Sequence, residues 1–526
     1  PPRSTLFPYT TLFRSFCKLS ACEGGFDYEA AKIVAGAGPA VLSGLVEQSF
    51  VQRKNAGRYA IHELLRQYAL GRLEECLPRG EHPAETHARY YLEFAARREA
   101  DLRGPRQPEA LEELAAEREN LRAALNWAIS TGRVDLLAPA LEALMSYLDL
   151  RGGYREAERL LARLADLPGE DLFGAWVNAH RGWVADRLAQ YEQGRDFSTR
   201  ALAAFEPQGH LAGQAAALGN LGLNAISRGA LEEAFDFLTR GLALARQAGD
   251  EACQARCLNL IGVIHKQRGD FVRAREILSQ SLGIFRALGD PQRTASLDNN
   301  LGAVLRALGD LEAARACYEE NLSIRRRLED PRGAALALVN LGNLLAQMEQ
   351  FEAARQAYQE SLAISGERDD PWGKSLCLHN LGDLARQDGA HALALRHYQE
   401  SLALRRRIQD RSGAAYSLAG LGHACAALRD WDATRAYFRE AAELAVELKL
   451  MPVALDALGG MAVLLSKDGE KEKAAALAGF VLSQPAAERQ TRRLLDGFPQ
   501  TAPGATTDLP SALGLAFGAD DAPQSA

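Results

Sequence analysis

A glycine recurs every 40 residues through most of this 526-residue chain, and no other feature constrains its fold as strongly. Alanine, leucine and aspartate recur with the same period, 12, 20 and 28 residues after the glycine. A constant period of this size is typical of a solenoid, in which each unit buries its apolar face only against its neighbours. The glycines are Gly182, Gly222, Gly262, Gly302, Gly342, Gly382 and Gly422.

Each 40-residue unit is predicted to fold as two helices. Apolar residues recur at three- and four-residue spacing in two stretches of each unit. In one unit, Asp290 can cap the first stretch, and Pro291 has the fixed φ of a first helical residue. A break at Gly309 then predicts a first helix that ends near Leu308 and a second that starts near Leu311.

This pattern resembles the tetratricopeptide repeat in a 40-residue form, longer than the usual ~34 residues. The resemblance covers roughly residues 170–485. It implies an all-α fold, a right-handed α-solenoid of about eight helix pairs. It also implies a protein or peptide ligand in the concave groove, which the first helix of each pair lines.

Polar residues lie beside the repeated glycine on the first helices. An asparagine amide offers a donor and an acceptor together, so a ladder of asparagines can pair with a peptide backbone. Arginines one turn away can hold ligand carboxylates. In the resembling proteins, asparagines at the matching place contact peptides. Alternatively, the asparagines bond to neighbouring helices and fix the stacking. The predicted groove residues are Asn259, Lys266, Asn299, Asn300, Arg306, Asn340, Asn343, His379, Asn380, Asp383 and Arg386.

The segment before the repeats has a different pattern. Two short helices, near 28–35 and 39–48, are predicted to precede strands at 50–53 and 58–61, with a turn at 54–57. A long helix is predicted from His62 to about residue 77. Two helices followed by a β-hairpin suggest a winged-helix unit.

The run Ile61-His62-Glu63-Leu64-Leu65 resembles the winged-helix segment of STAND signal-transduction ATPases of the NB-ARC type. Their hallmark here is Met-His-Asp or a close variant, so Ile61 and Glu63 depart from it. The resemblance implies that His62 senses the β-phosphate of bound ADP. Alternatively, His62 only caps the junction between strand and helix.

Residues 117–127 resemble the helical arm between winged helix and repeats in bacterial regulators of this class. We therefore interpret the chain as the C-terminal, sensor region of a STAND-type regulator of signal transduction or transcription. Its expected parts are a winged helix (16–80), a helical arm (81–169) and the repeat array (170–485). The alternative is a free-standing tetratricopeptide scaffold or adaptor without nucleotide-dependent switching.

Under the STAND interpretation, an upstream nucleotide-binding domain is a second partner. ADP or ATP then binds only the full-length protein, and nucleic acid binds only through a missing effector domain. This chain has no phosphate-loop motif, since the near match at Gly373-Lys374-Ser375 has Arg368 where the first glycine belongs. No catalytic set can be assembled, so we predict no enzyme, no cofactor and no metal in this chain.

Both ends of the chain are expected to lack structure. Residue 1 is Pro, and residues 3–15, RSTLFPYTTLFRS, resemble a translated sequencing adapter. We expect residues 1–15 to be artefactual and disordered, and an upstream part to be missing. The Pro-, Ala- and Thr-rich residues 486–526 predict a weak helix and a disordered tail.

Composition excludes several classes of protein. The 61 Lys and Arg nearly balance the 68 Asp and Glu, so the surface as a whole is not basic enough for a nucleic-acid protein. No run of 18 apolar residues is present to span a membrane. Eight cysteines without metal-type pairing indicate a reducing compartment, the cytoplasm. Cys253 and Cys257 are expected to be buried thiols.

Overall fold

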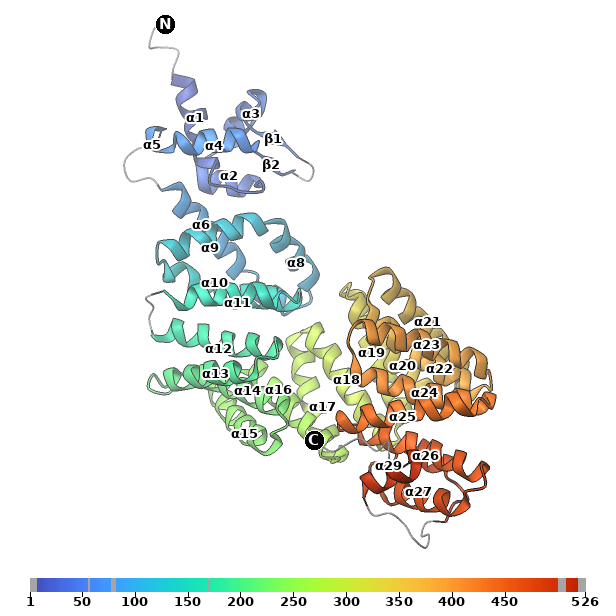
Figure 1. The fold of residues 1–526 in the computed structure, drawn as a ribbon. Coiled ribbons are helices and arrows are strands. Elements are labelled where there is room, and N and C mark those ends of the chain that lie inside the picture. The colour runs from blue at the N-terminus through green and yellow to red at the C-terminus, as the bar shows by residue number, and fades with distance from the viewer. Residues whose placement is uncertain (1–6, 55–56, 77–81, 168–170, 500–507, 519–526) are drawn as a thin grey trace. The chain divides into compact units, whose positions relative to one another are not determined.

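The structure, a computed structural model, describes residues 7–54, 57–76, 82–167, 171–499 and 508–518, and they are helical almost throughout (Figure 1). The chain divides into two compact units, Pro1–Leu308 (unit 1) and Gly309–Ala526 (unit 2), and each is described by itself. In the described residues, the strands form one two-stranded sheet. The prediction of an all-α fold is confirmed.

Unit 1 begins with short helices and a hairpin. These elements are α1 (Phe7–Leu19), α2 (Tyr28–Ala35), α3 (Pro39–Glu47), β1 (Gln52–Arg53), β2 (Tyr59–Ala60), α4 (Glu63–Gly71) and α5 (Leu73–Cys76). The strands pair antiparallel, with Gln52 opposite Ala60. Their order follows the sequence prediction, although the turn predicted at 54–57 lies partly outside the described residues.

The long helix predicted from His62 to about residue 77 is wrong, because the chain forms two helices there. The Arg72 N–H donates to Ala69 O at 3.1 Å, a bond that closes a three-residue turn and ends α4. Gly71 precedes this break, and glycine is a poor helix former. The helix α5 then starts at Leu73.

Disorder was predicted for residues 1–15, and this is wrong for residues 7–15, which belong to α1. Phe16 and Leu19 of this helix are fully buried, and Leu12 and Phe13 pack against the same core. Apolar residues three and four apart give α1 one buried face, which explains why it folds. Residues 1–6 lie outside the described part.

The helical arm shares its core with its neighbours on both sides. Its helices are α6 (Pro83–Ala96), α7 (Glu99–Leu102), α8 (Gln107–Ala116), α9 (Arg118–Ser130), α10 (Val134–Leu150) and α11 (Tyr154–Ala165). One cluster of buried side chains extends from Phe16, through Leu144 in the arm, to Phe173 and Val184. The boundaries expected at residues 80 and 169 therefore do not interrupt the hydrophobic core.

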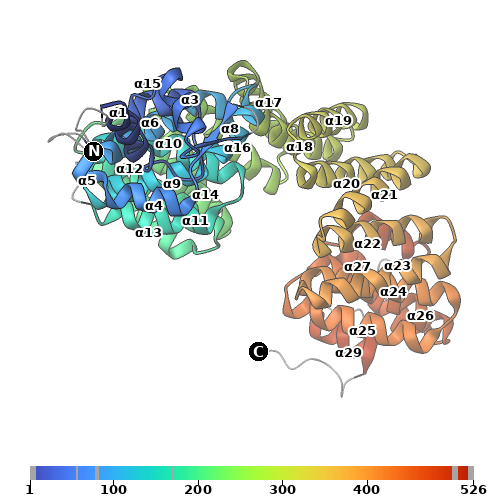
Figure 2. The ribbon, with the colours of Figure 1, turned by 90° about the horizontal axis from the view of Figure 1, so that it is seen from above.

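The repeats form helix pairs with a constant 40-residue period. Unit 1 holds α12 (Asp171–Arg187) with α13 (Tyr191–Phe205), α14 (Leu211–Ser227) with α15 (Leu231–Ala248), α16 (Glu251–Gln267) with α17 (Phe271–Leu288), and α18 (Pro291–Leu308). Unit 2 holds α19 (Leu311–Arg327), α20 (Pro331–Gln347) with α21 (Phe351–Glu367), α22 (Pro371–Gln387) with α23 (His391–Arg407), α24 (Arg411–Leu428) with α25 (Trp431–Glu447), and α26 (Met451–Lys467) with α27 (Lys471–Ser483). In unit 2, consecutive helices from α20 to α27 pack side by side (Figure 2).

Every turn between these helices uses one residue in the left-handed region, and these residues also recur every 40 positions. Glycine serves at Gly229, Gly269, Gly309, Gly389 and Gly469 within pairs, where it has no Cβ to clash. At the same place, Glu349 has a φ of 62° and Arg429 a φ of 65°. The period therefore fixes the backbone conformation of the turns as well as the helix lengths.

Aspartates cap the first helices as the sequence predicts. The Asp330 carboxylate accepts from the Gly333 N–H at 2.9 Å, and Asp410 accepts from the Gly413 N–H at 2.8 Å. Each bond satisfies a backbone donor that a helix start leaves without an intrahelical partner.

The repeated glycines permit close contact between the two helices of a pair. A Cβ added at Gly342 would lie 2.5 Å from the Tyr358 ring, and one at Gly222 would lie 2.5 Å from Leu238. A real Cβ atom does not come that close to a neighbouring side chain, so glycine fits there and a larger residue would force the helices apart. The partner residue comes 16 positions after the glycine, so the seam repeats along with the period.

The C-terminal end is more ordered than predicted. A short helix, α28 (Arg489–Leu494), lies within the range where a weak helix was expected. Residues 509–517, in the same range, form a second helix, α29 (Leu509–Phe517), where one weak helix was expected. Ala512, Leu513 and Ala516 bury one apolar face of α29 in the core of unit 2. Residues 500–507 and 519–526 lie outside the described part.

Other sequence features have structural counterparts. Cys253 and Cys257 are buried, as expected. Among the described residues, no group of three or more His, Cys, Asp and Glu is arranged to hold a metal ion. No single helix in this part is long and apolar enough to cross a membrane. The helices α2 and α3 together have the required length and apolar character, but they are bent by 101° relative to each other.

Candidate functional site

The predicted groove residues all lie on first helices of the repeat pairs. In unit 1, α16 carries Asn259 and Lys266, and α18 carries Asn299, Asn300 and Arg306. In unit 2, α20 carries Asn340 and Asn343, and α22 carries His379, Asn380, Asp383 and Arg386.

Four of the asparagines bond to each other between neighbouring first helices. The Asn300 amide donates to Asn259 Oδ1 at 3.2 Å, and the Asn380 amide donates to Asn343 Oδ1 at 3.2 Å. The Tyr358 hydroxyl also donates to Asn343 Oδ1, at 2.6 Å. These bonds favour the alternative in which these asparagines fix the stacking of the helices.

The two basic groove residues of unit 1 differ in their surroundings. Arg306 is exposed, whereas Lys266 is partly buried, and burial lowers the pKa of its ammonium group. They lie one repeat apart, at the position that Arg386 occupies in unit 2. Lys266 and Arg306 therefore lie in different environments.

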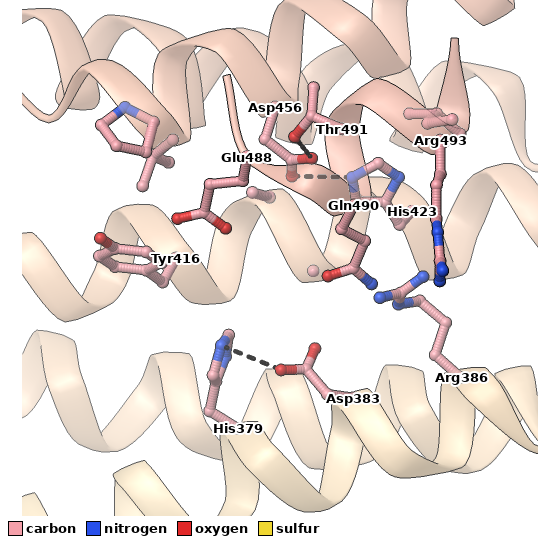
Figure 3. A pocket seen from close by; sticks show the side chains of 15 residues that line it. His379, Asp383, Arg386, Tyr416, His423, Asp456, Glu488, Gln490, Thr491 and Arg493 are labelled. Carbon is pink, nitrogen blue, oxygen red and sulfur yellow. Dashed lines mark hydrogen bonds and ion pairs between the residues drawn. The ribbon is translucent and has the colours of Figure 1, made fainter. Parts of the chain in front are cut away.

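Unit 2 has a polar pocket of about 490 Å³ on its first helices (Figure 3). The first helices α22, α24 and α26 form its base, and α28 with the preceding Glu488 covers one side. Three predicted groove residues, His379, Asp383 and Arg386, line it. The other polar lining residues are Tyr416, His423, Asp456, Glu488, Gln490, Thr491 and Arg493.

The helix α28 is held in place by Arg492. Its guanidinium donates to the carbonyl oxygens of Leu482 and Ala487 at 3.0 Å each and to that of Gln484 at 2.7 Å. Three charge-assisted bonds to one turn fix where the helix begins. The wall that α28 gives the pocket is therefore anchored in the turn that follows α27.

A chain of hydrogen bonds joins α28 to two first helices. The Asp456 carboxylate bonds His423 Nε2 at 2.8 Å and accepts from the Thr491 hydroxyl at 3.0 Å. Burial alone would raise the pKa of Asp456, but the His423 and Thr491 contacts hold it below its usual range. Asp456 is thus an ionised group whose charge is partly satisfied inside the pocket.

A second polar group lies on α22. Asp383 accepts from the Tyr398 hydroxyl at 2.5 Å, and His379 Nε2 lies 3.7 Å from its other carboxylate oxygen. Burial lowers the pKa of His379, so the neutral imidazole is favoured. In the described structure, the buried Nδ1 atom of His379 has no hydrogen-bond partner.

The pocket stabilises the charge of Arg386 but not that of Glu488. The Arg386 Nε is buried and has no hydrogen-bond partner in the described part of the chain. Burial raises the pKa of Glu488, and the carboxylates of Asp456 and Asp383 raise it further. Although burial lowers it, the neighbouring Tyr398 and Asp383 raise the pKa of Arg386, so Glu488 is the group that a cationic ligand would stabilise.

Sequence reasoning missed most of the lining. Tyr416 and Asp456 share one repeat position, and His423 occupies the position of Asp383 one unit later. Comparing polar residues at equivalent positions would have found these three. The residues of α28 have no such signal, because that helix lies outside the repeats.

His62, the predicted nucleotide sensor, is the exposed N-cap of α4. Its Nδ1 accepts from the Leu64 N–H at 3.4 Å, a long bond. His62 therefore caps α4, which is the role that the alternative interpretation gave it. A role toward ADP is not tested by this geometry and stays a prediction.

Models of the tetratricopeptide repeat match residues 213–287, 293–367 and 376–408, so the chain contains these repeats. The repeats bind proteins or peptides, and the chain is to that extent a protein-interaction array. No curated protein matches the sequence.

Several solved structures are similar to the chain. A STAND protein with a tetratricopeptide repeat sensor from Pyrococcus horikoshii is 14% identical, with a TM-score of 0.47, over 91% of this chain and 64% of that one. The quorum sensor NprR from B. thuringiensis is 14% identical, with a TM-score of 0.47, over 68% and 99%. BtubC from P. vanneervenii is 20% identical, with a TM-score of 0.38, over 42% and 92%.

Proposed function

We propose that this chain is the ligand-receiving region of a cytoplasmic STAND-type regulator, and that the first-helix face of unit 2 binds a peptide or a flexible protein segment. The observation that carries the binding role is the polar pocket over α22, α24 and α26. It brings three predicted groove residues together, and the buried Nε of one of them, Arg386, has no hydrogen-bond partner among the described residues.

The regulatory part of the proposal is supported by the segment around His62. The resemblance of residues 61–65 to the STAND winged helix coincides with two helices, a hairpin and a histidine at the next helix start. In the full-length protein, His62 would contact ADP in an upstream nucleotide-binding domain. Ligand capture by the array would then change how tightly that domain retains ADP.

The binding role is tested by affinity selection from a mixture of random decapeptides in solution. The purified chain should enrich a defined set of sequences, identified by mass spectrometry. Arg386→Ala should lose that set, whereas Arg396→Ala, an exposed arginine on α23, should retain it. A selection with no enriched sequences, or the same set from both variants, would contradict the proposal.

The regulatory role is tested by nucleotide exchange in the full-length protein. His62→Ala should speed release of labelled ADP and raise basal activity, because the resting state loses a phosphate contact. His82→Ala is the matched control, since His82 is also exposed at a helix start but makes no side-chain cap bond. Unchanged ADP release in His62→Ala would favour the free-standing scaffold instead.

A further inference from the structure

Two thiols lie one helical turn apart on α16, in a part of unit 1 that the proposed function does not use. Cys253 is 5% exposed and Cys257 is fully buried, and both belong to one hydrophobic cluster with residues of α15. Residues four apart lie on the same face of a helix. The two thiols are also hydrogen-bonded to each other. The pair therefore presents two neighbouring sulfur atoms inside the protein.

A guanidinium group lies beside this pair. Arg256 Nη2 donates to Cys253 Sγ at 3.7 Å, and the buried Nε of Arg256 has no hydrogen-bond partner among the described residues. The hydrogen bond from Cys257 lowers the pKa of Cys253, burial opposes this, and the charge of Arg256 adds to the lowering. The surroundings thus stabilise a thiolate, which is the form of cysteine that binds metal ions.

The charge of Arg256 is directed mainly to the thiols. Burial lowers the pKa of Arg256, and the two cysteines raise it more than the carboxylate of Glu142 does. Glu142 is itself paired with Arg103 and with His180. The guanidinium group is therefore placed to compensate a negative charge at the pair of thiols.

The helix that faces Cys257 has a glycine where unit 2 has a hydroxyl. In unit 2, the Cys377 thiol contacts Ser361 Oγ on the facing helix at 3.1 Å. Gly241 of α15 occupies the position of Ser361, and a Cβ added there would lie 3.5 Å from Cys257 Sγ. Gly241 offers no side chain to Cys257, so the joint between α15 and α16 has space for about one more atom beside the sulfur.

Two sulfur donors select among metal ions. A structural zinc ion takes four ligands, and among the described residues no group of three or more His, Cys, Asp and Glu is arranged to hold an ion. Soft thiolate ligands select Cu(I), an ion that two thiolates in line suffice to bind. A monovalent ion between two thiolates has a net charge of −1, and Arg256 supplies the opposite charge.

We propose that Cys253 and Cys257 bind a soft monovalent metal ion of the Cu(I) class, with Arg256 as the counter-charge. On binding, two S–H bonds lose their protons to solvent and two bonds from sulfur to the metal form, with no transfer of electrons. The site lies in unit 1 and does not depend on the proposed peptide site in unit 2.

Copper retention by the whole, reduced chain under argon tests the proposal. One equivalent of Cu(I) is added, followed in steps by bathocuproine disulfonate, a chelator that forms a coloured complex with Cu(I). The unaltered chain should withhold the ion until the chelator is in large excess. X-ray absorption by the copper-loaded chain should show two sulfur ligands and no nitrogen ligand.

Variants assign the ion to the two thiols. Cys253→Ala and Cys257→Ala should each weaken retention at least about a hundredfold, more than the loss of an outer partner of a metal site usually costs. Alanine fits at position 257, since Ala217 occupies the same place in another unit. The matched control is Cys377→Ala, which should retain the ion, because Cys377 has Gly373 where the second thiol would be.

The role of Arg256 is tested by comparing two ions. Arg256→Gln should weaken retention of Cu(I) about tenfold. It should weaken retention of Hg(II), measured against an excess of a competing thiol, much less. The reason is that a divalent ion between two thiolates leaves no net charge for the guanidinium group to compensate.

The proposal is wrong if the unaltered chain releases Cu(I) as readily as folded Cys257→Ala, if Cys377→Ala loses the ion as well, or if Arg256→Gln weakens both ions equally. Circular dichroism checks that each variant is folded. If a variant does not fold, X-ray absorption by the unaltered chain decides, and a single sulfur ligand contradicts the proposal. The random-decapeptide selection judges the proposed function separately, and its result does not depend on this site.

Discussion

Single asparagines on the first helices bond to neighbouring helices, and this gives them a measurable role in stability. Asn343 accepts from Tyr358 within its own pair and from Asn380 on the next first helix. One carbonyl oxygen therefore ties together three helices, α20, α21 and α22. A partly buried acceptor with two donors is costly to remove, because both donors then lose this acceptor.

We predict that Asn343→Ala lowers the free energy of unfolding by about 1–3 kcal/mol. Tyr358→Phe removes one donor and keeps the amide pair, so it should cost only about 1 kcal/mol. Urea denaturation followed by circular dichroism measures both. If Asn343→Ala is as stable as the unaltered chain, the stacking role is refuted.

At the scale of the element, the turns between helices explain both the regularity of the repeats and its exceptions. Glycine is the favoured residue at the left-handed position within each pair, but Glu349 and Arg429 adopt the same conformation. A side chain with a Cβ pays a steric cost there that glycine avoids. At these two positions, a glycine would therefore make the folded protein more stable than the residue that is present.

We expect Glu349→Gly to raise the free energy of unfolding by about 0.5–1 kcal/mol, the left-handed penalty less the added flexibility of the unfolded chain. The matched change in the opposite direction is Gly389→Ala, which should lower it by about 1 kcal/mol. Thermal and urea denaturation measure both. Destabilisation by Glu349→Gly would show that another interaction of that glutamate outweighs the strain.

The helices were predictable from sequence because their signals are local. Asp330 caps a helix and Pro331 starts it, and these residues sit next to the features they determine. The pocket was only partly predictable. His379, Asp383 and Arg386 follow the repeat, but Gln490 and Arg493 reach the pocket from about 100 residues away in the chain. Only folding brings such groups together, and the composition of residues 486–526 predicted a weak helix but not that it packs against the repeats.

At the scale of the whole molecule, the N-terminal helices, the arm and the first repeat helix of unit 1 share one hydrophobic core and are not independent modules. Phe173, Val177 and Val184 of α12 belong to the same buried cluster as the arm. The first repeat therefore relies on the arm in the way that inner repeats rely on their neighbours. A repeat that loses its neighbour exposes apolar surface and becomes less stable.

We predict that a fragment starting at residue 171 has weaker amide protection in α12 than the whole chain. Hydrogen exchange followed by mass spectrometry measures this, with α26 of unit 2 as the internal reference. Protection in α26 should be the same in both proteins. Equal protection of α12 in both would mean that the array begins without help from the arm.

The central claim is that the first-helix face of unit 2 receives a peptide, and photo-crosslinking tests it most directly. A decapeptide from the affinity selection, carrying one benzoylphenylalanine, is bound to the whole chain and irradiated, and the crosslinked residues are found by mass spectrometry. The account predicts crosslinks on α22, α24, α26 and α28. Crosslinks confined to the second helices α23 and α25, or to unit 1, would contradict it.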